Sequence, residues 1–91
     1  MPMSSLEFKT LLNEFEKDIQ QINDSLYQAT KPKATASQRN DVIKNARSKL
    51  KAYDTLLGQL QGERRAQAVR DFGAFMEEMK QYLAQLERKP S

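Results

Sequence analysis

The last of three apolar repeats constrains the fold of this chain most strongly. Large apolar side chains recur there at alternating intervals of three and four residues: Val69, Phe72, Met76, Met79, Leu83 and Leu86. This spacing is typical of a helix that buries one narrow stripe against other helices. Phe75 and Tyr82 lie seven residues apart beside the stripe and widen it.

Two earlier segments have the same spacing. The first stripe consists of Phe8, Leu12, Phe15, Ile19, Ile22 and Leu26. The second consists of Ile43, Ala46, Leu50, Tyr53, Leu57 and Leu60. Because each stripe needs helices on both sides of it, we predict an all-α fold, an antiparallel up-down-up three-helix bundle. Residues 1–91 would form a single domain, with helices over about residues 5–28, 36–61 and 65–89.

Local signals set the helix ends. Ser4–Glu7 and Thr35–Gln38 both fit a capping box, in which two side chains satisfy free backbone N–H groups reciprocally. Pro32 cannot continue a helix, so it places a linker between the first two segments. Gly62 can supply a left-handed residue just past the last turn of the second helix.

The composition argues against catalysis. The chain has neither Cys nor His, so the commonest metal ligand, the commonest general base and a thiolate nucleophile are all missing. The acidic pairs Glu14/Glu16 and Glu77/Glu78 are too close in sequence to face one another on a helix. We therefore predict a protein that is not an enzyme, with no catalytic residue, no metal site and no cofactor.

Charge is distributed unevenly along the chain. Residues 1–30 have five acidic and two basic side chains, whereas residues 31–51 have one acidic and seven basic ones. The two helices could attract each other, or the second could offer a basic face to an outside partner. Lys44, Arg47 and Lys51 would share that outward face, which we call the basic face.

Two readings of the basic face remain open: a solvated polar surface, or a docking site for an acidic protein or for anionic lipid headgroups. Nucleic acid is a weaker option, since no exposed aromatic residues alternate with these charges and the net charge is only +3. Phe75 and Tyr82 likewise either complete the core or form one wall of an apolar groove for a further helix. Such a groove would also allow self-association as a structural helical bundle.

Several short stretches resemble a known family. They are Phe8-Lys9-Thr10 after a Met/Ser start, Ser37-Gln38-Arg39-Asn40 before the second helix, and the run from Leu56 to Glu63 at its end, which is similar to L-L-x-Q-[M/L]-x-x-E. With a third helix of matching length, the chain resembles the N-terminal Habc-type three-helix domain of Vti-type Qb-SNAREs. The pair Gly58 and Gly62 departs from the pattern of that family.

The resemblance implies a role in vesicle trafficking and membrane fusion, at the cytosolic face of Golgi, endosomal or vacuolar membranes. The partner would be an ENTH-type clathrin adaptor that recognises the bundle. Other SNAREs would bind through a C-terminal SNARE motif, followed by a membrane anchor, which we expect beyond Ser91. Lys44, Arg47, Lys51, Phe75 and Tyr82 are the candidate partner-binding residues from our reading of the residues.

Overall fold

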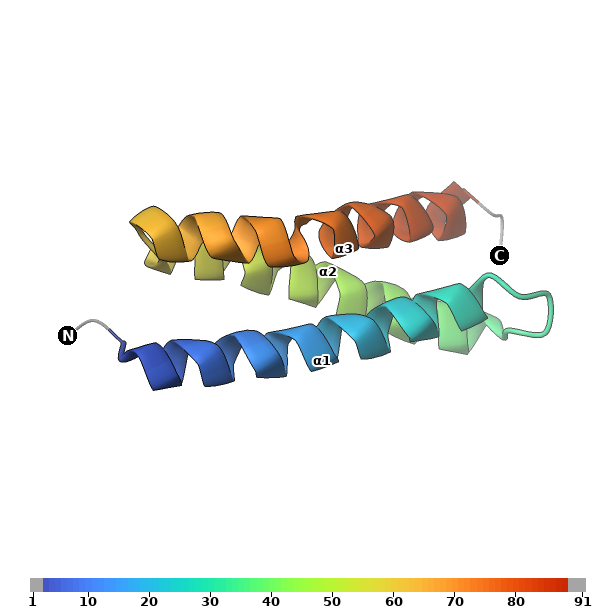
Figure 1. Ribbon diagram of the computed structural model, residues 1–91. Helices are drawn as coiled ribbons and strands as arrows, with labels where there is room; N and C mark the ends of the chain where they lie inside the picture. Colours follow the sequence, from blue (N-terminus) through green and yellow to red (C-terminus); the bar gives the residue numbers. More distant parts are fainter. Residues whose placement is uncertain (1–2, 89–91) are drawn as a thin grey trace.

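The structure is a computed structural model that describes residues 3–88. It contains three helices, α1 (Ser5–Ala29), α2 (Ala36–Gln59) and α3 (Gly62–Arg88), and no strand among the described residues. The chain runs up, down and up, so α1 and α3 are parallel and α2 is antiparallel to both (Figure 1). The bundle measures 46 × 18 × 18 Å. The predicted three-helix bundle is thus confirmed.

Both predicted capping boxes are present. At the start of α1, the Glu7 N–H donates to Ser4 Oγ over 3.1 Å and the Ser4 N–H donates to Glu7 Oε1 over 3.3 Å. At the start of α2, the Gln38 N–H donates to Thr35 Oγ1 over 3.1 Å and the Thr35 N–H donates to Gln38 Oε1 over 2.9 Å. Each pair therefore satisfies two N–H groups that a helix leaves free at its first turn.

The connection from α2 to α3 is shorter than expected. Helix α2 ends at Gln59 and not at residue 61, because Leu60 has an extended backbone with φ −97° and ψ 151°. Gly62 has a φ of 60°, the left-handed conformation that the sequence predicted there. Helix α3 begins at this glycine and not at residue 65. The predicted end of this helix at residue 89 lies outside the described residues.

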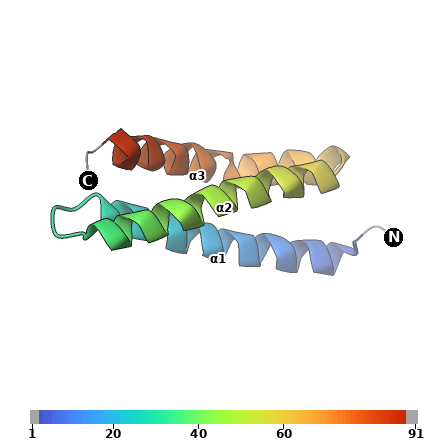
Figure 2. The same ribbon diagram turned by 180° about the vertical axis from the view of Figure 1, so that it is seen from behind.

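Side chains from all three helices fill the core. Phe15 of α1 lies between Tyr53 of α2 and Phe72 of α3, with ring centroids 6.2 Å and 5.0 Å away. Ile19 and Met79 are fully buried, and Leu50 is half-buried. Seen from both sides, α2 lies along the groove between α1 and α3, as Figure 2 shows. The apolar stripes thus face one another, as the spacing predicted.

Two members of the predicted stripes are misplaced. Val69 is 46% exposed, whereas its neighbour Ala68 is completely buried. On α2, Leu56 is buried and Leu57 is only half-buried, the reverse of the predicted order. In both cases the buried residue is the adjacent position that also fits the alternation of three and four residues, while the flanking members of the stripe are buried as predicted. The exchange leaves a smaller side chain in the core at the start of α3.

An ion pair joins the acidic helix to the basic one. Lys49 Nζ of α2 lies 3.1 Å from Asp18 Oδ2 of α1. The same ammonium group lies 5.0 Å from the centre of the Phe15 ring, over the core. Lys49 can do both because its long apolar stem packs along the helix while its charge stays near water. Part of the charge difference between α1 and α2 therefore contributes to an attraction between these two helices.

Candidate functional site

The basic face of α2 is exposed, but one of its three charges is paired. Lys44 and Lys51 have no ion-pair partner within residues 3–88. Arg47 forms an ion pair with Glu87 of α3, through the guanidinium Nη2 and the carboxylate Oε1. The free positive charge of this face therefore comes from Lys44 and Lys51, while Arg47 helps to hold α2 against α3.

Phe75 and Tyr82 of α3 lie at the edge of the core, and the Phe75 carbonyl accepts a hydrogen bond from Asn23 of α1. Both side chains are half-buried and pack against the core. Burial raises the pKa of the Tyr82 phenol, and the nearby Glu78 carboxylate raises it further, so this phenol remains neutral. The two rings thus help to complete the core and expose only part of their surface to a partner.

Asn23 is the residue that the sequence reasoning missed. It is the buried polar side chain of the described core, 8% exposed, and it lies on α1 opposite α3. Its Nδ2 donates to the carbonyl oxygen of Phe75 over 3.4 Å, while its Oδ1 is buried without a hydrogen-bond partner. The prediction placed Ile22 in the stripe, and Ile22 is half-buried. A buried amide with one free acceptor weakens the α1–α3 contact at this level.

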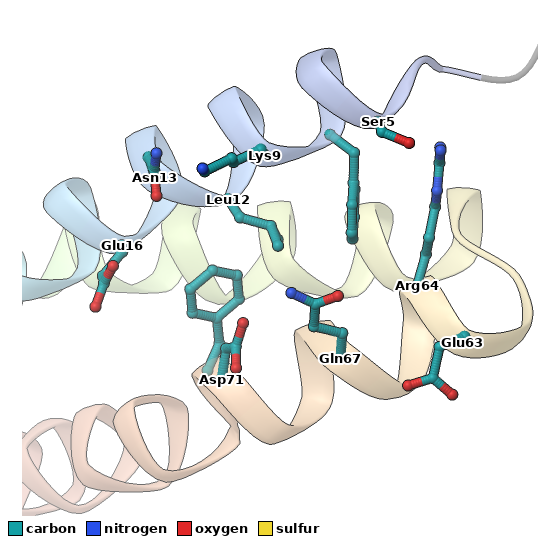
Figure 3. A pocket seen from close by; sticks show the side chains of 11 residues that line it. Ser5, Lys9, Leu12, Asn13, Glu16, Glu63, Arg64, Gln67 and Asp71 are labelled. Atoms are coloured by element: carbon teal, nitrogen blue, oxygen red, sulfur yellow. The ribbon is translucent and has the colours of Figure 1, made fainter.

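A polar groove runs between the first turns of α1 and α3 (Figure 3). Arg64 stands at one end of it, where the guanidinium carbon lies 5.0 Å from the centre of the Phe8 ring and Nη1 donates to the Met3 carbonyl over 2.6 Å. Lys9 and Asp71 line its sides with opposite charges. The groove therefore presents no single charge sign that would select an ion.

Metal ligands and the buried phenol of Tyr53 are the remaining chemical groups to consider. Within residues 3–88 there is no group of three acidic side chains close enough to hold a metal ion. Tyr53 has a pKa raised chiefly by burial and further by the Asp54 carboxylate, with Lys80 acting in the opposite direction, so this phenol also stays protonated. The side chains on the surface can bind through charge, hydrogen bonds and apolar contact.

Protein families, curated proteins and solved structures were all compared, and none matches this chain. Among the described helices, none is long and apolar enough to cross a membrane.

Proposed function

We propose that this chain is a non-enzymatic protein-interaction module, the N-terminal regulatory or sorting domain of a Vti-type Qb-SNARE in vesicle trafficking. The supporting observation is the three-helix bundle, in which most of the apolar stripes pack into the core while Lys44 and Lys51 are exposed on α2. The short motifs that resemble the SNARE family lie within this same bundle. An ENTH-type clathrin adaptor is the proposed partner.

Recognition would combine charge and a few apolar anchors. The basic face would attract an acidic adaptor surface and raise the association rate, since exposed charges at an interface act mainly on encounter. Most of the binding free energy would come from a small number of side chains that become fully buried on binding. Phe75 and Tyr82 suit this role because each has a large ring that is already held in place by the core.

The test is a titration of an ENTH-type adaptor domain with the chain at low salt. A variant with Lys44→Glu, Arg47→Glu and Lys51→Glu should bind at least tenfold more weakly, mainly through a slower association rate. The matched control reverses three exposed charges elsewhere, Lys9→Glu, Lys17→Glu and Arg65→Glu, and so has the same net charge.

Circular dichroism checks that both variants fold, which matters because Arg47→Glu places a second carboxylate beside Glu87. Equal affinity of the basic-face variant and the native chain would remove the basic face from the mechanism. Absence of binding by the native chain would refute the adaptor proposal itself.

Self-association is the second candidate function. Leu6 is 75% exposed and Val69 is 46% exposed, so both offer apolar surface to a second copy of the chain. Sedimentation equilibrium distinguishes the two functions, because a chain that stays monomeric at high concentration has no stable contact with its own copies.

A further inference from the structure

One end of the bundle is markedly basic. The α1–α2 linker and the last turn of α3 meet at this end (Figure 1). The linker exposes Lys31 and Lys33, and α3 contributes Arg88. Arg39 of α2 folds back onto the linker and donates from Nη1 to the Ala34 carbonyl over 2.8 Å. We call these four side chains, Lys31, Lys33, Arg39 and Arg88, the basic end.

Acidic side chains offset only part of this charge. Residues 25–40 contain no acidic residue at all. Asp24 lines the same surface hollow as Lys31 and Lys33, and Asp41 lies one turn inside α2. Glu87 is engaged by Arg47. The opposite end differs, because Arg70 there is paired with Glu63 over 2.8 Å and Asp71 lies nearby.

An aromatic ring accompanies the charges. Tyr27, in the last turns of α1, is 45% exposed. Lys31 Nζ donates to its hydroxyl over 2.8 Å and lies 4.2 Å from the centre of its ring. Lys31 thus stays positioned beside an amphipathic ring, and tyrosine is the kind of side chain that is enriched where protein meets the membrane–water interface.

We propose that the basic end contacts the surface of an anionic lipid bilayer. A bundle 18 Å across presents an end face on the order of a few hundred Å², which is small compared with the roughly 800 Å² that each partner contributes to a stable protein interface. A lipid surface needs no shape complementarity and supplies many equivalent negative charges. This inference goes beyond the adaptor proposal and does not depend on it.

The experiment is co-sedimentation of the chain with vesicles made of equal parts phosphatidylcholine and phosphatidylserine, at low salt. Each exposed lysine near such a surface strengthens binding about fivefold, so Lys31→Gln with Lys33→Gln should weaken it about twenty-five-fold. The matched control, Lys9→Gln with Arg65→Gln, removes the same charge near the opposite end and should change binding less than twofold.

Five results bear on the proposal. Loss of binding in the linker variant alone, together with weaker native binding as salt rises, supports it. Equal loss in both variants would overturn it, because any positive charge would then serve. Absence of native binding, or equal binding to pure phosphatidylcholine vesicles, would also overturn it. Binding of duplex DNA as tight as binding of the anionic vesicles would also overturn the proposal, since the basic end would then bind any phosphate-rich polyanion.

Discussion

Replacing Asn23 with leucine should stabilise the protein. Leucine has nearly the same shape as asparagine, so the α1–α3 contact can keep its geometry. The change removes the buried Oδ1 that has no partner, which costs about 1–3 kcal/mol in the native state. It also removes a long 3.4 Å hydrogen bond, of which the Phe75 carbonyl is the acceptor. That loss is about 0.5–1 kcal/mol.

The net gain should therefore be about 0–2.5 kcal/mol in the free energy of unfolding, with a midpoint slightly above 1 kcal/mol. For a domain of this size, each kcal/mol raises the midpoint of thermal unfolding by about 4–8 °C. Urea and thermal unfolding followed by circular dichroism measure both quantities. Asn13→Leu is the matched control, since Asn13 is exposed on the same helix and its replacement should change stability by less than about 0.5 kcal/mol.

A third variant tests whether the unpartnered amide oxygen of Asn23 is the cause of the stability change. Asn23→Asp should destabilise by about 3 kcal/mol or more at neutral pH, because it buries a carboxylate without a cation. If Asn23→Leu were less stable than the native chain, the unpartnered amide oxygen would not be the weak point of the α1–α3 contact, and this reasoning would be refuted.

Further substitutions test the helices and their ends. Gly73→Ala should stabilise α3 by about 1 kcal/mol, since an added Cβ meets open space. Gly62→Ala should instead destabilise the protein by about 1 kcal/mol, because the φ of Gly62 is 60°. If both substitutions changed the free energy of unfolding in urea in the same direction, this contrast would be contradicted. Thr35→Ala should cost about 1 kcal/mol by removing the α2 capping box, and an unchanged urea midpoint would count against it. Because the folded pKa of Tyr53 lies above its ordinary 10.0, the native state holds its proton longer, so stability should fall as pH rises above about 10. Tyr53→Phe should reduce that fall, and an identical pH profile would exclude Tyr53 as its source.

The starts of α1 and α2 and most of the core could be predicted because their causes are local. A capping box needs only residues three apart, so Ser4 and Thr35 could be identified from the sequence. The alternation of three and four residues likewise identified Ile19, Phe72 and Met79 as core. Helix identity and the inward face of each helix thus follow from neighbouring residues.

The choice between two adjacent positions that both fit a stripe could not be predicted in the same way. Ile22 and Asn23 both fit the repeat of α1, and only the position of α3 decides that Asn23 is the more buried. Ala68 and Val69 likewise both fit the repeat of α3, and Ala68 is the one that is buried. A hydrophobic pattern defines a stripe to within about one residue, and packing between helices decides which of two adjacent residues is buried.

The charge pairing within the candidate site was harder still to predict, because it depends on contacts between residues that are distant in sequence. Nothing near Arg47 in the sequence indicates that Glu87 neutralises it, because the two residues meet only when α2 and α3 pack together. Lys44 and Lys51 could be predicted as exposed from their place on the helix alone. Of the five candidate partner-binding residues, those two lysines therefore keep most of the charge that an acidic partner would meet.

The most direct test of the central proposal is a nuclear magnetic resonance titration of the isotope-labelled chain with an ENTH-type adaptor domain. We expect the backbone signals around Lys44 and Lys51 to shift progressively, while those of Ile19 and Met79 in the core stay in place. Signals that remain unchanged throughout at saturating adaptor would contradict the proposal that this bundle is an adaptor-recognition module.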